Sequence, residues 1–380
     1  MKVAVVLDSF KGSLSSRDAG DAVAAGILRA DPHAEVTVLP LADGGEGTVD
    51  ALVFGRRGRT VTARVHDPLG REIEASYGIL DDNTAVIEMA AAAGLPLLHT
   101  EERDPMRTTT RGVGELILDA LHRGCRKFII GIGGSATNDG GVGMLSALGF
   151  AFLDAEGSQI PDGAQGLARL SHISVKGAET ALSEAEFRVA CDVTNPLCGP
   201  MGCSAIYAPQ KGATEEQIAL MDGYLARYAE LTRATLPLAD ANYPGAGAAG
   251  GLGFAFLAYL GASLQSGVSL VLETLNAAQC FETADLVITG EGRLDGQSAM
   301  GKAPVGVARL AKQWNKPVIA LGGGIREDAK ALHDFGIDAL FSILQAPISL
   351  EVAMQAAVAR ENLSRTAEEA IRLILATNKR

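Results

Sequence analysis

The sequence predicts an α/β protein, in which a doubly wound, mostly parallel sheet domain is built from both chain ends and a second, mixed α/β domain is inserted. Near both ends, short runs of Val, Ile and Leu precede Gly, Ser or Asp turns and helical periodicity, which is typical of buried parallel strands in βαβ units. Between them, apolar and polar residues alternate, as in an antiparallel sheet with one solvated face. The 380 residues also exceed one domain of about 150 residues.

The elements of the first domain follow in chain order. Near the N-terminus we expect a strand at residues 3–7, a helix over about 15–30 and a strand at 36–39. Late in the chain the same order returns, with a strand at 286–289, a helix at 304–312, a strand at 318–321, an apolar segment at 337–343 and a C-terminal helix from Leu350 onward. Strands that alternate with helices in this way form a parallel sheet.

The middle of the chain follows another pattern. Alternation over 60–87, with a turn at 67–70, predicts an antiparallel hairpin. We therefore expect one domain from residues 1–55 plus 284–380 and an inserted domain from 56–283. Residues 127–131 have the pattern of a buried strand, so the segment 127–150 fits either domain.

The composition argues against several function classes. A net charge of -12 and a pI near 5.1, without a cluster of Lys and Arg, argue against a nucleic-acid partner. No apolar stretch reaches the roughly 20 uncharged residues of a membrane span, and Asp8 ends the first apolar run too early for a signal peptide. We therefore expect a cytoplasmic protein without a membrane partner. The five cysteines lack the spacing of a zinc or redox site.

Glycine is over-represented, with 45 in 380 residues against a usual share of about 7%. The segment 245–250 is a literal G-x-G-x-x-G, but no strand precedes it, so close packing of the following helix explains it better. The loop from Gly131 follows a strand and has Asp154 about 20 residues later, as in a dinucleotide-binding turn. That pattern supports a nicotinamide-dependent dehydrogenase, whereas the polar side chains over 135–139 argue against one.

A third glycine loop, residues 296–303, nearly matches the phosphate-binding pattern G-x-x-x-x-G-K-[ST]. Ala303 lacks the hydroxyl that would hold magnesium, and the preceding strand is expected to end too early, at Thr289. The loop is therefore not a Walker A motif. Lys302 nevertheless stands just before Pro304, at the start of a predicted helix, where a phosphate would be stabilised.

Charged residues follow three of the predicted strands, at the edge where ligands bind in open α/β sheets. None of the six histidines occupies a catalytic motif, so the residues favour magnesium and charge positioning over Ser-His-Asp catalysis. Phosphoryl transfer needs metal-holding carboxylates, Lys or Arg for the phosphoryl oxygens and a glycine backbone around them. The residues alone therefore predict a small-molecule kinase. The charged residues are Lys11 after the first strand, Asp43 and Glu46 after the second, and Glu291, Arg293 and Asp295 after the strand at 286–289.

Six longer motifs follow one another along the chain. They are DSFKGSL at 8–14, PLADGGEGT at 40–48, GIGGSATNDGG at 131–141, ACDVTNP at 190–196 with PQKGA at 209–213, GAGAAGGLG at 245–253, and VITGEGR at 287–293 with Gly301 and Lys302. Together they resemble the bacterial glycerate kinase family. The resemblance covers nearly the whole chain and is far more specific than a single glycine loop.

The resemblance implies ATP-dependent phosphorylation of D-glycerate, and the chain is similar to the branch that phosphorylates the 2-hydroxyl to give 2-phosphoglycerate and ADP. It implies ATP and Mg2+ as cofactors and a two-domain α/β architecture with the site in the cleft between the domains. A nicotinamide-dependent dehydrogenase of a small hydroxy acid and a non-catalytic sugar-acid sensor stay as alternatives.

The resemblance also suggests roles for single residues. Lys11 and Lys302 would neutralise ATP phosphates. One of Asp43, Asp192 and Asp295 would accept the hydroxyl proton or hold magnesium, with Asp192 and Asp295 as the metal candidates. Arg293 could grip the glycerate carboxylate with two hydrogen bonds. The residues expected to bind substrate or phosphate are Ser9, Gly44, Gly45, Glu46, Gly133, Gly134, Ser135, Thr137, Asn138, Asp139, Asn195, Glu291, Arg293 and Lys302.

Overall fold

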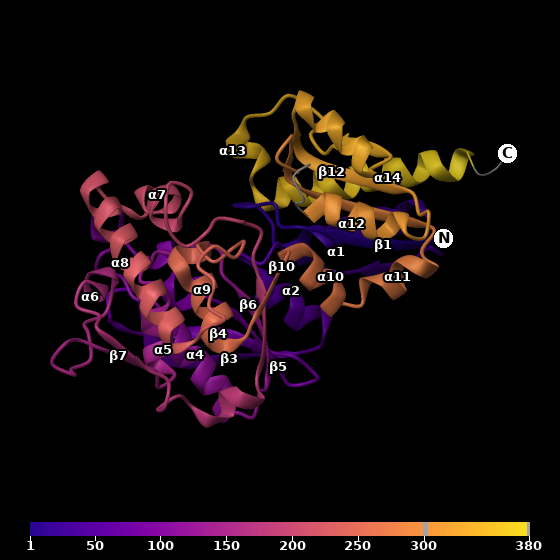
Figure 1. Cartoon of the computed structure of the whole chain (residues 1–380). Coiled ribbons are helices and arrows are strands. Elements are labelled where there is room, and N and C mark those ends of the chain that lie inside the picture. The colour runs from indigo at the N-terminus through magenta and orange to yellow at the C-terminus, as the bar shows by residue number, and fades with distance from the viewer. Residues whose placement is uncertain (299–302, 378–380) are drawn as a thin grey trace. The chain divides into compact units, whose positions relative to one another are not determined.

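The computed structural model describes residues 1–298 and 303–377 (Figure 1). The chain forms two compact units. Unit 1 is Met1–Asp43, Asp50–Arg56 and Val268–Arg380, and unit 2 is Gly44–Val49 and Arg57–Gly267. The domain boundaries predicted after residues 55 and 283 stay a prediction.

Unit 1 is built on a five-stranded sheet with the order β13-β12-β11-β1-β2. All neighbouring strands are parallel, which confirms the predicted parallel sheet made from both chain ends. In register, Val3 lies opposite Leu286 and Leu7 opposite Gly290. The strands are β1 (Lys2–Leu7), β2 (Glu35–Val38), β11 (Leu286–Leu294), β12 (Val318–Ile325) and β13 (Ala339–Ser342).

Helices cover both faces of this sheet. Val3, Val5 and Leu7 share a hydrophobic cluster with residues of α1 and α14, two helices that pack against each other (Figure 1). Ala4 and Val6, on the opposite face, are also fully buried, and α11 and α12 contact β1. The doubly wound arrangement follows from this. The helices of unit 1 are α1 (Ser16–Ala30), α2 (Thr48–Gly55), α10 (Gly267–Thr274), α11 (Ala277–Thr283), α12 (Ala303–Lys312), η6 (Glu327–Phe335), α13 (Leu350–Ala353) and α14 (Ala356–Thr377), of which α2 and α10 begin in unit 2.

In unit 1 the predicted ends of two strands and the continuity of the C-terminal helix were wrong. Strand β12, predicted to end at residue 321, continues to Ile325. Strand β11 continues past Thr289 to Leu294, because Gly290, Glu291 and Leu294 keep pairing with β12. The C-terminal helix is divided, since α13 ends at Ala353 and α14 begins at Ala356.

Unit 2 contains a six-stranded sheet with the order β10-β9-β6-β5-β4-β3. The predicted hairpin is confirmed, because β3 and β4 pair antiparallel and the Gly70 amide donates to the Asp67 oxygen at 3.0 Å in the turn. The predicted strand at 127–131 is β6, which pairs parallel with β5 and β9 in this sheet. The strands are β3 (Arg59–His66), β4 (Glu72–Ile79), β5 (Thr84–Glu88), β6 (Lys127–Gly131), β9 (Glu186–Ala190) and β10 (Ser263–Gln265), with β7 (Ala151–Leu153) and β8 (His172–Ser174) in a separate pair.

The G-x-G-x-x-G segment opens α9 (Ala248–Leu260), whose residues Ala249, Gly250 and Gly251 have left-handed φ values, so the regular helix begins at Leu252. A Cβ on Gly250 would lie 2.1 Å from the Thr137 oxygen, so close packing explains this glycine, as predicted. The other helices of unit 2 are α3 (Ala90–Ala93), η1 (Leu95–Leu97), η2 (Thr100–Glu102), α4 (Arg111–His122), α5 (Val142–Ala147), α6 (Ala164–Leu167), η3 (Thr180–Glu184), α7 (Cys203–Tyr207), η4 (Pro209–Lys211) and α8 (Glu215–Thr235). Over residues 1–298 and 303–377, no helix is both long and apolar enough to cross a bilayer.

Candidate active site

The carboxyl edge of the unit 1 sheet carries a buried carboxyl group. Asp8 directly follows β1, its amide donates to the Gly290 oxygen at 2.9 Å, and the residue is only 6% exposed. Burial, together with the carboxylates of Asp43 and Glu291, raises the pKa of Asp8 to about 7, although the Ser9 amide and the Lys11 ammonium oppose the shift. Parallel strands thus bring the predicted residues Asp43, Glu291 and Lys11 within electrostatic reach of one another.

Asp8 itself was missed among the predicted site residues. The available signal was a carboxylate at the end of a buried strand, at the edge where α/β sheets bind ligands. Its Oδ1 accepts the Ser9 amide at 2.6 Å, so the local backbone fixes the carboxyl group. A carboxyl group held there with a pKa near neutrality can accept or release a proton.

Lys11 lies in the turn that follows Asp8. The Phe10 amide donates to the Leu14 oxygen at 2.9 Å, and between them the Lys11 side chain is exposed. Its ammonium makes no hydrogen bond or ion pair with any residue that the structure describes. It is therefore available to an anionic ligand. The other predicted phosphate lysine, Lys302, lies outside the described residues.

Asp295 is engaged by its own turn. Its Oδ1 accepts the amides of Gln297 at 3.0 Å and Ser298 at 3.3 Å, and its Oδ2 accepts Arg293 Nε at 2.8 Å. Desolvation alone would raise the pKa of Asp295, but these donors outweigh it and hold the pKa below its ordinary value. Ser298 Oγ in turn donates to Glu291 Oε1 at 2.6 Å. Both carboxylate oxygens of Asp295 are therefore engaged by residues of its own turn.

In unit 2, a glycine loop follows the carboxyl end of β6. Gly133 and Gly134 are exposed, and the amides of Gly133, Gly134 and Ser135 donate to no residue of the described part of the chain. The loop is fixed on either side, since the Leu95 amide donates to the Gly134 oxygen and the Ala136 amide to the Ala93 oxygen, both at 2.9 Å. Consecutive free amides near a left-handed glycine, here Gly134 with φ +75, are typical of anion-binding nests.

The glycine turn at Gly44 and Gly45 lies against the same strand ends. Gly44 has φ +88, and a Cβ there would lie 2.4 Å from the Ala190 Cβ at the end of β9. Gly133 approaches Gly45 closely enough that an added Cβ would lie 3.2 Å from the Gly45 Cα. Glu46, in the same turn, is exposed.

The polar residues after Ser135 point into the protein rather than to solvent. Thr137, Asn138 and Asp139 are at most 1% exposed. Asp139 accepts the amide and hydroxyl of Thr110 at 2.8 Å each and the amides of Gly141 and Gly143 at 3.1 and 3.2 Å. Burial raises the pKa of Asp139, and these donors partly oppose the shift. The structure thus gives Asp139 the role of joining the starts of α4 and α5, and its predicted contact with a ligand stays a prediction.

Two predicted site residues, Asp192 and Asn195, follow β9 and differ in exposure. Asp192 is exposed, and its Oδ1 accepts the Gly267 amide at 3.2 Å. Asn195 has both ends of its amide engaged, because Nδ2 donates to the Met201 oxygen at 2.8 Å and Tyr207 donates to Oδ1 at 2.6 Å. The Asn195 side chain therefore fixes its own loop, and the contact of either residue with a ligand stays a prediction. Over the described residues, no group of three or more His, Cys, Asp or Glu side chains could hold a metal by itself.

The loop after β6 does not have the geometry of a dinucleotide-binding turn. Such a turn begins its helix within the glycine motif, but α5 begins only at Val142. Asp154 follows β7, which pairs with β8 outside the main sheet, and its Oδ2 accepts Arg169 Nη2 at 2.6 Å. The observations that supported a dehydrogenase therefore have structural explanations.

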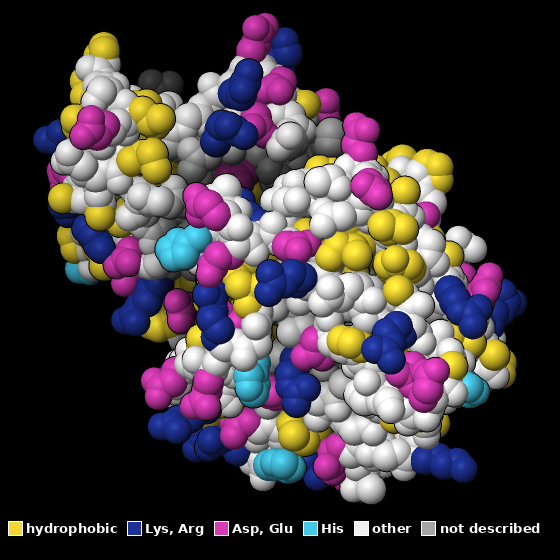
Figure 2. Space-filling model, turned by 90° about the vertical axis from the view of Figure 1, so that its left-hand side faces the viewer, with side chains coloured by type: hydrophobic (Ala, Val, Ile, Leu, Met, Phe, Trp, Pro, Cys, Tyr) yellow, Lys and Arg dark blue, Asp and Glu magenta, His cyan; other side chains and the backbone are white. Residues whose placement is uncertain are grey.

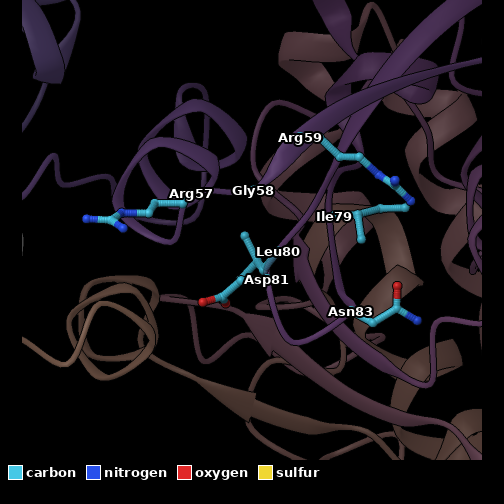
Figure 3. Close-up of a pocket in the computed structure, with 7 residues that line it drawn as sticks. All are labelled: Arg57, Gly58, Arg59, Ile79, Leu80, Asp81 and Asn83. Atoms are coloured by element: carbon cyan, nitrogen blue, oxygen red, sulfur yellow. The ribbon is translucent and has the colours of Figure 1, made fainter.

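A separate pocket of unit 2 lies at the opposite edge of the six-stranded sheet, before β5. It has a volume of about 310 Å³, and Arg57 and Arg59 at its rim point away from each other (Figure 3). On the face shown in Figure 2, Lys and Arg side chains are interspersed with Asp and Glu. Neither the pocket nor this face therefore carries a cluster of positively charged side chains.

Comparison with known proteins decides between the predicted functions. Residues 3–375 match the model of the glycerate kinase family. The chain belongs to this family. Two glycerate kinase relatives cover nearly its whole length. A glycerate 2-kinase from Escherichia coli strain K12 is 48% identical over 94% of this chain and 94% of its own. A glycerate kinase from Bacillus subtilis strain 168 is 47% identical over 97% of this chain and 96% of its own.

A solved glycerate kinase structure has the same fold. A crystal structure described as glycerate kinase 2 from Salmonella typhimurium LT2 superimposes with a TM-score of 0.92 at 45% identity, and the match covers 100% of each chain. The family resemblance drawn from the six motifs is therefore confirmed. Neither the dehydrogenase nor the sugar-acid sensor gains support from these comparisons.

Proposed function

We propose that this protein is a glycerate 2-kinase, which transfers the γ-phosphoryl group of ATP to the 2-hydroxyl of D-glycerate and releases 2-phosphoglycerate and ADP. The observation that carries the proposal is the match to the glycerate kinase family over residues 3–375. The relative named glycerate 2-kinase, 48% identical over 358 residues, supports the choice of the hydroxyl. No membrane or nucleic-acid partner is needed for this reaction, and the cytoplasm stays the predicted location.

The strand ends of unit 1 are proposed to serve the phosphoryl transfer. Lys11, exposed and without a partner among the described residues, would neutralise phosphate oxygens of ATP, and Lys302 would do the same. Asp8 joins Asp43 as a candidate for the base that accepts the hydroxyl proton, because a pKa of about 7 suits proton transfer near neutral pH. Arg293 stays a candidate for gripping the glycerate carboxylate.

Mg2+ is proposed to accompany ATP. Magnesium in kinases is usually held by one or two carboxylates together with substrate phosphates and waters, so single carboxylates at the strand ends fit it without a complete protein cage. Asp192 and Asp295 are the proposed metal candidates, and the two oxygens of Asp295 accept three donors from its own turn. The ion would neutralise charge on the phosphates, and the protein residues would orient both substrates.

In unit 2, the free amides of Gly133, Gly134 and Ser135 are proposed to bind an oxyanion, either the glycerate carboxylate or a phosphate. Main-chain donors suit this task, because they are fixed before the ligand arrives and add no charge that must be desolvated. The buried side chains of Thr137, Asn138 and Asp139 would then shape the loop rather than contact the ligand.

A direct assay tests the proposal. We expect ADP when the full chain is incubated with ATP, Mg2+ and D-glycerate, and much less with L-glycerate or without acceptor. Absence of ADP together with measurable glycerate binding would favour the sugar-acid sensor. Oxidation of NADH with a keto acid would favour the dehydrogenase instead.

A further inference from the structure

A lysine is fully buried in unit 2. Lys211 ends η4 and is 1% exposed; it belongs to the motif 209–213, which has no role in the proposed reaction. Its Nζ donates to the main-chain oxygen of Thr137 at 2.7 Å. Lysine is almost never fully buried without a charged partner, yet Lys211 forms no ion pair with any described residue.

The surroundings keep this lysine charged at neutral pH. Burial lowers the pKa of Lys211 to about 8, while the Cys203 thiol of α7 and the Asp139 carboxylate oppose the shift. From α8 the same cluster contains Met221, whose sulfur lies 3.6 Å from Asn138 Nδ2 and does not titrate. A positive charge is thus held inside unit 2 below about pH 8.

Lys211, Thr137 and Asn138 have hydrogen-bonding atoms that no described residue pairs. An ammonium has three donors, and the described residues offer Lys211 one acceptor. The buried Oγ1 of Thr137 and Oδ1 of Asn138 also have no partner within the described part of the chain. Buried polar clusters that serve stability alone are normally fully paired, so stability by itself does not explain the charge.

The Lys211 ammonium is bonded to the same loop that carries the free amides. Gly134 is three residues before Thr137, so the two are within about 11 Å even if the chain between them is extended. Together with the 2.7 Å bond, this places Gly134 within about 14 Å of the ammonium. At an effective dielectric constant of about 20, a unit charge at such a distance changes the affinity for an anion by roughly tenfold.

We propose that Lys211 is a positioning residue for oxyanion binding: it fixes the loop through the Thr137 carbonyl and adds positive charge near the loop's free amides. The ligand is a small oxyanion, a carboxylate or a phosphate. That this oxyanion belongs to glycerate or to a phosphorylated substrate rests on the proposed function. The dependence of anion binding on Lys211 does not rest on that function.

Three variants of the full chain test this role. Lys211→Met removes the charge at similar volume, and Lys211→Arg keeps the charge. Lys312→Met is the matched control, because Lys312 Nζ also donates to a main-chain oxygen, that of Lys316 at 2.9 Å in unit 1. Calorimetric titration uses D-glycerate as the carboxylate probe and sulfate, which stays a dianion, as the phosphate probe.

We expect Lys211→Met to weaken one probe by roughly tenfold at neutral pH, with Lys211→Arg and the control within about twofold of the unmodified protein. The probe that weakens identifies the anion. In the unmodified protein the affinity for that probe should fall as the pH rises through about 8, because the ammonium loses its proton. This fall should be absent from both Lys211 variants.

Unchanged affinity for both probes in Lys211→Met would overturn the inference. If that variant does not fold, identical pH profiles of the unmodified protein and Lys211→Arg would overturn it instead. The two proposals fail separately. A chain without kinase activity whose anion affinity still depends on Lys211 contradicts only the proposed function, and an active kinase whose affinity ignores Lys211 contradicts only this inference.

Discussion

Asp8 shows how one residue can be unfavourable for the fold and useful for chemistry. It closes a strand whose residues Val3 to Leu7 are all buried, so its carboxyl group is desolvated beside the carboxylates of Asp43 and Glu291. Desolvation and like charge both favour the protonated form. The carboxyl group is therefore poised between its two forms near neutral pH.

Stability should reflect this shift in the pKa of Asp8. Between its ordinary value of 3.8 and about 7, the folded state binds a proton that the unfolded state has lost. The free energy of unfolding should therefore fall as pH rises through this window, by at most about 4 kcal/mol. Asp8→Asn removes the titration, so its stability relative to the unmodified protein should rise with pH and level off above about 7. Urea unfolding of both proteins in metal-free buffer across this pH range measures the difference in stability. If the two free energies of unfolding change with pH in parallel, the pKa of Asp8 is not raised.

Lys11 allows a direct test of charge at the unit 1 strand ends. Lys11→Ala should lower turnover at least about a hundredfold if the ammonium contacts the transferring phosphoryl group. Lys330→Ala is a suitable control, because Lys330 is an exposed lysine of the same unit that lies 3.9 Å from Glu327. Steady-state kinetics with saturating substrates provide the measurement. A turnover equal to that of the control would remove Lys11 from the mechanism.

At the scale of elements, Asp139 joins two helices. Its carboxylate accepts donors from the first residues around α4 and α5, and negative charge at a helix N-terminus is favourable. The loop between β6 and α5 is therefore held at its base by one buried side chain, while its glycine tip stays exposed.

Asp139→Ala should consequently act on stability. It leaves the Thr110 and glycine amides unpaired in a buried place, and we expect a loss of about 3–5 kcal/mol in the free energy of unfolding. Asp240→Ala, at an exposed aspartate whose carboxylate accepts only the Asn242 amide among the described residues, should change this free energy by less than about 0.5 kcal/mol. Denaturant titrations compare the two. A fully stable Asp139→Ala variant with lost substrate affinity would restore Asp139 as a ligand residue.

The strands were predictable because buried parallel strands are short continuous segments rich in Val, Ile and Leu, as in β1, β6 and β12. The extension of β11 was not predictable, since Gly290 has a weak strand preference and pairs with Leu321 of β12 because of the register of the sheet. In the candidate site, Lys11, Asp43 and Glu291 were found from their places after strands. The burial of Thr137 to Asp139 was hidden, because polar residues in a loop have the same sequence pattern whether they face a ligand or satisfy the backbone.

At the scale of the whole molecule, the family match extends from residue 3 to residue 375, and both chain ends contribute strands to one sheet. The motifs that carry the family resemblance are likewise spread over the chain, from residues 8–14 after β1 to residues 287–293 in β11. No single loop carries the reaction, and this is why the order of six motifs was more informative than any of them alone.

The central claim is that the chain phosphorylates the 2-hydroxyl of D-glycerate. Phosphorus NMR of the reaction with ATP, Mg2+ and D-glycerate tests it most directly, because 2-phosphoglycerate and 3-phosphoglycerate give distinct signals. We predict ADP and 2-phosphoglycerate in equal amounts, with the product consumed on addition of enolase alone. A product signal from 3-phosphoglycerate, or inorganic phosphate as the only product, would contradict the claim.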